Sequence, residues 1–222
     1  LPGALAEAGY QTHFCGKIHT WPKRALYGFM SSDWSDMAGL RGDDDYTEFL
    51  RREGYPKERR HLMPVADANT WVARPWTEPE YLHPTNWTTD SALRFLERRD
   101  PTKPYFLKVS YYFPHQPAVP PQVFWDRYIH ADLPGPVSAD WSAEQMEADA
   151  SHTVSAWKGQ LSPAEMQQFR VGYYGLINHI DEQIGRILRC IDKSNTLILF
   201  VADHGEMLGD HGLYRKTRPL EG

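Results

Sequence analysis

The sequence predicts an α/β fold with a mainly parallel central sheet and helices on both faces. Helical and strand patterns follow one another along the 222 residues, which is typical of this class. Residues 196–202 form a continuous apolar run of the kind found in buried parallel strands. After Ser162, apolar residues recur at three- and four-residue steps over several turns, which predicts one long helix.

The first half of the chain alternates predicted elements with one long irregular region. Residues 1–9 have the spacing of a helix that stops at Gly9, and Thr88 or Thr89 is the expected cap of a later helix. The predicted ranges are, in order, helix 1–9, strand 10–15, loop 21–85 with a short helix near 46–52, helix 88–98 and strand 105–112.

The second half begins with another long loop, at residues 117–157, and ends in the long helix and a strand. Ser162 is the expected cap of that helix, with Pro163 at its first position and Glu165 completing a capping box. The helix is expected to reach about residue 191, followed by the strand at 196–202. We interpret residues 1–222 as part of a single domain with loop insertions at about 21–85 and 117–157.

Composition argues against several other classes of protein. Hydrophobic residues make up 41% of the chain, which suits a globular domain with a buried core. The net charge of −5 does not favour nucleic-acid binding, which is typical of basic surfaces. No run approaches the roughly 18 apolar residues that a membrane-spanning helix needs. Two cysteines are too few for a disulfide framework.

Polar side chains gather where the three predicted strands end. Ligands of open α/β sheets bind beyond the carboxyl ends of the strands, so we expect an active site at this edge. The candidates are Lys17 and His19 after the first strand, His115 after the second, Asp203 and His204 after the third, and Lys216 in the glycine-rich loop that follows.

These residue types suit a divalent cation and an anionic substrate. Asp203 offers the hard oxygen donors that Ca²⁺ and Mg²⁺ prefer, and His204 is a candidate for a metal ligand or a substrate contact. Lys17 and His19 are two residues apart on an extended segment, so both face the same way and can offset negative charge or donate a proton. Taken singly, each also fits a structural role, as a helix cap or a solvated side chain.

Three segments resemble the sulfatase family, and they occur in the family's order. AGYQT at residues 8–12 followed by GKIH at 16–19 is similar to the A-G-Y-x-T and G-K-x-H segments of sulfatases. PHQP at 114–117 is similar to their P-H-x-P loop, and ADHGEMLGDHGL at 202–213, followed by Lys216, is the most specific match. The resemblance spans nearly the whole chain and implies a sulfatase catalytic domain of the alkaline phosphatase superfamily.

The resemblance also implies roles for the candidate residues. Asp203 and His204 would ligate one divalent cation, Ca²⁺ rather than Mg²⁺, although many sulfatases have Asn in place of His204. His19 would assist the nucleophile, and His115 would be the candidate acid for the leaving oxygen. The residues implied to bind the sulfate group are Lys17, His115 and Lys216.

The family's nucleophile is absent from these 222 residues. Sulfatases use a formylglycine made from Cys or Ser in a motif upstream of G-K-x-H, and neither Cys15 nor Cys190 lies in such a motif. Cys190 is expected to lie in the core, on the long helix. Because the chain begins inside a helical pattern and stops at Gly222 without an ending signal, we expect a piece cut at both ends and inactive alone.

The implied reaction is hydrolysis of a sulfate monoester of a small molecule or a glycan. Two alternatives stay open: a phosphonate or phosphate ester hydrolase of the same superfamily, and a non-catalytic relative that binds anionic glycans. Loop tryptophans are candidates for stacking on sugar or aryl rings, but we favour a structural role for them. They are Trp71, Trp76, Trp87, Trp125, Trp141 and Trp157.

Overall fold

The computed structural model describes residues 1–36, 44–55, 70–142 and 161–216, which divide into two compact units. The first unit comprises Leu1–His61, Glu78–Tyr112 and Ile180–Thr196, and the second comprises Leu62–Thr77, Phe113–His179 and Leu197–Gly222. Within the described ranges, no helix has both the length and the apolar character needed to cross a membrane.

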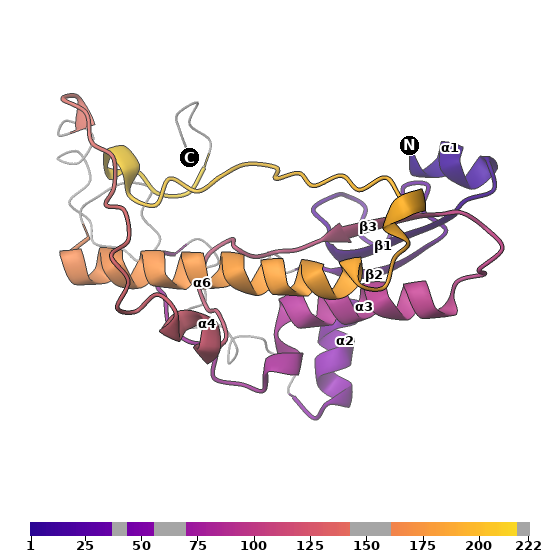
Figure 1. Ribbon diagram of the computed structural model, residues 1–222, viewed down its shortest axis with the longest axis horizontal. Coiled ribbons are helices and arrows are strands. Elements are labelled where there is room, and N and C mark those ends of the chain that lie inside the picture. The colour runs from indigo at the N-terminus through magenta and orange to yellow at the C-terminus, as the bar shows by residue number, and fades with distance from the viewer. Residues whose placement is uncertain (37–43, 56–69, 143–160, 217–222) are drawn as a thin grey trace. The chain divides into compact units, whose positions relative to one another are not determined.

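A three-stranded parallel sheet forms the centre of the first unit (Figure 1). Its strands are β1 (Gln11–Lys17), β2 (Ser31–Ser35) and β3 (Tyr105–Ser110), in the order β2-β1-β3. The prediction of an α/β fold with a parallel sheet is therefore confirmed. Parallel pairing brings the carboxyl ends of all three strands to one edge, so the residues after β1 leave the sheet there.

Strand β2 was not predicted, because it lies inside the region assigned to the loop at 21–85. Its sequence is short and mostly polar, and only Trp34 and Ser35 at its end are buried. Nothing in such a segment shows the apolar alternation by which a strand is recognised. Pairing with β1, from His13 opposite Ser31 onward, is what makes it a strand.

Helices cover one face of this sheet. α3 (Pro84–Arg98) and the last turns of α6 (Pro163–Leu188) pack against it, and Figure 1 shows both beside the strands. Cys15, Ala92 and Ile187 form the buried cluster between them, so one residue each from β1, α3 and α6 meets at the centre. Period-two alternation places the neighbouring strand residues on the opposite face.

The opposite face is packed with aromatic rings. Phe29 lies in the loop before β2, with its ring centroid 5.8 Å from that of Phe14 and 5.7 Å from that of Phe106. Aromatic rings at such distances contribute favourably beyond the area they bury. This cluster fixes the loop between β1 and β2 against the sheet.

Most predicted helices are confirmed, with changed ends. α1 (Pro2–Glu7) and α2 (Asp45–Arg52) agree with the expected positions. α6 begins at Pro163, and the Ser162–Glu165 capping box is formed in both directions. Short elements that were not predicted are η2 (Glu80–Leu82), α4 (Gln122–Asp126), η3 (Lys193–Asn195) and η4 (Asp210–Gly212).

The predicted cap of α3 is wrong. The helix begins at Pro84, and the Nδ1 atom of His83 accepts a hydrogen bond of 3.2 Å from the Thr85 amide. Thr88 and Thr89 therefore lie inside the helix. A proline suits the first helical position, since its ring fixes φ and no amide is lost there, and this signal outweighs the threonines.

The prediction of a central strand at residues 196–202 is also wrong. No strand pairs with this segment among the described residues, and its apolar side chains are exposed, Leu197 by 85% and Val201 by 83%. An apolar run becomes a buried strand only where neighbouring strands satisfy its backbone groups. Cys190 is likewise exposed instead of buried, because α6 ends at Leu188.

Gly16 is required by the backbone at the end of β1. Its φ is +101°, and a Cβ atom built on it would lie 2.0 Å from the carbonyl oxygen of Ser110 on β3. We predict that Gly16→Ala destabilises the protein by on the order of 1–3 kcal/mol from backbone strain alone, with the clash adding to it. Chemical denaturation measures the change in the free energy of unfolding.

Gly135→Ala is the matched control for this substitution, since a Cβ atom at Gly135 meets no atom within 4 Å. Its free energy of unfolding should stay close to that of the unsubstituted protein. Equal effects of the two substitutions would contradict the role assigned to Gly16.

His13 makes stability depend on pH. Burial lowers the pKa of its ring, which stacks on Phe95 at 4.7 Å and bonds to the Ser31 hydroxyl at 2.8 Å. Near pH 6 the unfolded chain therefore binds a proton at His13 that the folded chain does not bind. The contribution of His13 to the free energy of unfolding is complete above about pH 6.5 and is lost as the pH falls below that value. We predict a decline in unfolding free energy from pH 7.5 to 5.

The variant His13→Phe keeps a ring against Phe95 but cannot titrate, so its decline over this pH range should be smaller. His130→Gln, at an exposed histidine, is the control and should keep the original slope. Identical slopes in all three proteins would exclude His13 as the source.

Candidate active site

Lys17 and His19 leave the sheet at the carboxyl end of β1. Lys17 is the last residue of the strand, and its Nζ atom lies 5.8 Å from the centroid of the Tyr112 ring. The Ile18 amide donates to the Ser35 carbonyl at 3.2 Å, which extends the pairing with β2 past the strand. His19 follows on the exposed side of this edge.

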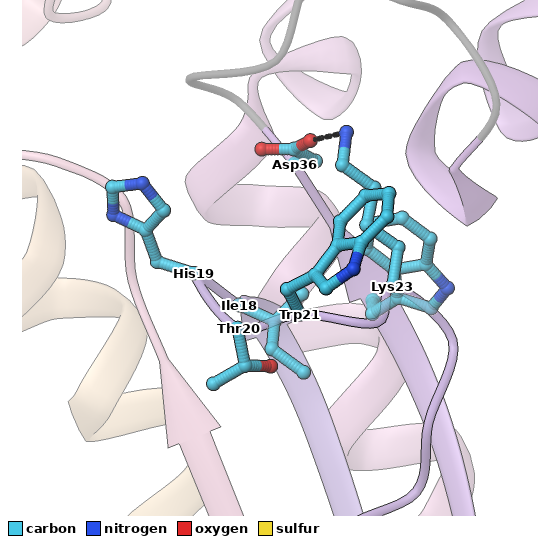
Figure 2. A pocket seen from close by; sticks show the side chains of 7 residues that line it. Ile18, His19, Thr20, Trp21, Lys23 and Asp36 are labelled. Atoms are coloured by element: carbon cyan, nitrogen blue, oxygen red, sulfur yellow. Dashed lines mark hydrogen bonds and ion pairs between the residues drawn. The ribbon is translucent and has the colours of Figure 1, made fainter.

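A hollow of about 330 Å³ opens beside His19 (Figure 2). Figure 2 shows the His19 ring on one side of it and the Trp21 indole on the other, with Asp36 between them at the rim. Lys23 forms an ion pair with Asp36. The remaining lining residues are Ile18, Thr20 and Trp34.

In the second unit, His115 and Lys216 are in direct contact although 101 residues separate them. The Nζ atom of Lys216 lies 2.7 Å from Nε2 of His115. The other ring nitrogen, Nδ1, lies 2.9 Å from the carbonyl oxygen of Gln116. A carbonyl only accepts, so Nδ1 carries the proton, and Nε2 accepts from the Lys216 ammonium.

A tight turn holds Lys216 in place. The half-buried Glu206 carboxylate accepts a hydrogen bond from the Arg215 amide, and the Met207 amide donates to the Arg215 carbonyl at 3.0 Å. Gly209, in the left-handed region at φ +88°, lets the chain reverse between these two segments. Partial burial in this turn raises the pKa of the Glu206 carboxyl.

Arg170 of α6 binds the same turn through its guanidinium. Its guanidinium donates to the carbonyl of Leu208 at 2.9 Å, to the Asp210 carboxylate at 3.2 Å and to the carbonyl of Pro134. Asp210 in turn accepts the Val137 amide at 2.9 Å. One side chain thus connects residues 208–210 to the loop after α4.

Asp203 and His204 lie at the exposed start of this segment. Nδ1 of His204 lies 2.9 Å from the Gly205 carbonyl, so it carries the proton, and the lone pair of Nε2 remains available to a metal ion. Nε2 lies 3.7 Å from the Asp203 carboxylate. This donor pair fits part of a cation site, because a second group fixes the tautomer of the ligating ring.

A complete metal site is not formed within the described ranges, where no group of three His, Cys, Asp or Glu side chains could hold an ion. Asp203 and His204 supply two donors, whereas Ca²⁺ takes six to eight oxygen ligands and Mg²⁺ six.

The two cysteines fit the expectation that neither is the nucleophile. Cys15 is fully buried, and burial raises the pKa of its thiol, so the reactive thiolate does not form. Cys190 is exposed and lies just after the end of α6.

Sequence reasoning missed several residues of this region. Arg170 and Tyr112 carry no local signal, since their importance comes from contacts with distant segments. The tryptophan that stands out is Trp21, which is 80% exposed and was not among those considered.

The tryptophans that were considered mostly have the structural role favoured for them. Trp76, Trp87 and Trp125 are buried, and Trp71 packs against Tyr214 at 5.4 Å. Trp141 is 42% exposed and stacks on His211, while Trp157 lies outside the described residues.

Comparisons with known proteins identify the family of the chain. The family model described as Sulfatase matches residues 1–222. An arylsulfatase of Clostridium perfringens is 38% identical over 241 residues, covering all of this chain and 50% of the relative. A multifunctional alkaline phosphatase superfamily protein of Trinickia caryophylli is 31% identical over 188 residues, covering 75% of this chain and 35% of the relative.

Among solved structures, the phosphonate monoester hydrolase of Agrobacterium radiobacter superposes with a TM-score of 0.74 at 22% identity, covering the whole chain and 50% of that structure. This likeness shows the alkaline phosphatase-like fold. The chain spans half or less of the length of these relatives. With a family match over its full length and 38% identity to an arylsulfatase, the chain belongs to the sulfatase family.

Proposed function

We propose that the complete protein carrying this chain hydrolyses sulfate monoesters of small molecules or glycans. The reaction is R–O–SO₃⁻ + H₂O → R–OH + SO₄²⁻ + H⁺, in which the bond between sulfur and the alcohol oxygen breaks. The observation that supports it best is the 2.7 Å contact of Lys216 with His115, in a chain of the sulfatase family.

Lys216 is proposed to bind the sulfate group. Its ammonium donates to the Nε2 atom of the imidazole, and an ammonium group is a suitable donor for anionic oxygens. The Glu206 turn and Arg170 fix the backbone from which it extends, which lowers the cost of holding the side chain ready. Lys17, the last residue of β1 in the first unit, is proposed as a further sulfate-binding residue.

His115 is proposed to bind sulfate and to act on the leaving oxygen. In the observed tautomer its Nε2 atom accepts from Lys216, so the ring donates there only after taking up a proton. A sulfate oxygen placed between the two side chains would accept from both and favour that protonated ring. His19 is proposed to assist the nucleophile.

A divalent cation is proposed at Asp203 and His204, with its other ligands contributed by parts of the complete protein outside this sequence. Calcium is proposed ahead of magnesium, because Ca²⁺ tolerates irregular ligand sets. When bound, the cation would offset charge on the sulfuryl oxygens. The nucleophile is proposed to be a formylglycine, also outside this sequence.

The proposed function is tested by comparing the hydrolysis rates of a sulfate ester and a phosphonate ester that share the leaving group 4-nitrophenol. With the complete protein, we expect kcat/KM for 4-nitrophenyl sulfate to exceed that for 4-nitrophenyl phenylphosphonate, since the family model and the arylsulfatase relative both favour sulfate. Release of 4-nitrophenol measures both rates.

The opposite preference would favour the phosphonate ester hydrolase alternative. Binding of sulfated glycans with no turnover of either ester would favour the non-catalytic alternative. Either result would contradict sulfate ester hydrolysis as the main activity.

Substituting Lys216 should remove much of the activity. We predict that Lys216→Ala lowers kcat/KM for 4-nitrophenyl sulfate by about 10²–10³-fold, the usual effect of losing one preorganised donor to a developing anion. Lys193→Ala, at an exposed lysine of η3, is the matched control and should keep full activity.

The double variant Lys216→Ala/His115→Ala should be less impaired than the product of the two single effects, because the two side chains contact each other. Full activity of Lys216→Ala would contradict the proposed role of Lys216.

A further inference from the structure

One wall of the hollow beside His19 is formed by Trp21, an aromatic residue that lies outside the sulfatase motifs. Trp21 is 80% exposed, yet it borders a concave site and does not cover the core. Exposing a whole indole forgoes the free energy that burial would contribute. Aromatic side chains lining a hollow are typical contacts for the rings of ligands, which bury that surface when they bind.

The floor of the hollow is rigid and apolar. Trp34 is only 2% exposed, and the guanidinium of Arg24 lies 5.1 Å from its ring centroid. The backbone amide of Trp34 donates to the Asp45 carboxylate at 2.9 Å, which fixes the end of β2. The exposed indole of Trp21 therefore lies beside a fixed surface, and a ring entering the hollow would need little rearrangement.

The charges in the wall cancel each other. Lys23 and Asp36 form an ion pair, with side-chain exposures of 26% and 9%. A cationic leaving group would meet the Lys23 ammonium and find the Asp36 carboxylate already paired, so the hollow does not favour a quaternary ammonium. A sugar needs many hydrogen-bond partners. Apart from His19 and this ion pair, the side chains of the lining offer the hydroxyl of Thr20 and the indole N–H groups of Trp21 and Trp34.

We propose that Trp21 determines substrate specificity by stacking on the flat, uncharged ring of an aryl leaving group. The proposal rests on the sulfate ester hydrolysis proposed above, because His19 lines the same hollow and places the ring beside the reacting ester. It assigns a substrate class to a residue outside the sulfatase motifs.

The test compares an ester with a ring and an ester without one in the complete protein. Trp21→Ala should lower kcat/KM for 4-nitrophenyl sulfate by about 3- to 10-fold, the usual effect of one aromatic pair, and leave kcat/KM for ethyl sulfate unchanged. Trp21→Phe should keep most of the activity on the aryl ester. Met30→Ala, at another exposed apolar residue of this unit, should change neither rate.

Equal losses on both esters would overturn the proposal, since they would show that Trp21 acts on the site as a whole. An unchanged kcat/KM of Trp21→Ala for 4-nitrophenyl sulfate would also overturn the proposal.

If the complete protein hydrolyses neither ester, the proposed function fails while the stacking role is still measurable. Equilibrium dialysis of 4-nitrophenol then decides it. Binding weakened about 3- to 10-fold in Trp21→Ala would support the stacking role, and equal binding by both proteins would overturn it.

Discussion

The ordered turn in the second unit depends on the buried guanidinium of Arg170. Removing such a charge from water costs several kcal/mol unless hydrogen bonds offset the loss. Here the two terminal nitrogens of the guanidinium donate to the Leu208 carbonyl, to Asp210 and to a carbonyl of the loop after α4. Leu208 and Pro134 lie in loops, and Asp210 begins the single short turn of η4. A helix thus supplies the rigidity that the loops lack, and α6 holds Arg170 through its long run of backbone hydrogen bonds.

A short series of contacts connects Arg170 to the candidate catalytic residues Lys216 and His115. With Leu208 and Asp210 held, Gly209 reverses the chain, and Glu206 can accept the amide of Arg215. Lys216 is the next residue, so its side chain starts from a fixed backbone and meets His115. Preorganisation of this kind is what lets a charged donor act on an anion without first being ordered.

Two histidines in the second unit make the same kind of hydrogen bond to the backbone. In His115 and in His204 the Nδ1 proton is donated to a carbonyl of the next residue along the chain. Each ring therefore presents Nε2 as an acceptor, toward Lys216 in one case and toward a metal ion, as proposed, in the other. Sequence alone names the histidines, but the tautomer follows from the local backbone conformation.

Local patterns in the sequence determined the α/β class, the α6 helix with its capping box, and the motifs at residues 8–19, 114–117 and 202–213 that resemble those of the sulfatases. These signals act over three or four residues, or within one strand, so they survive without knowledge of the rest of the fold. Only the tertiary structure decided that residues 31–35 pair as a strand while 196–202 do not, because pairing depends on which neighbour offers its backbone. It likewise decided that Lys216 reaches His115 and that Trp21 stays exposed, since burial and contact are set by segments distant in the chain.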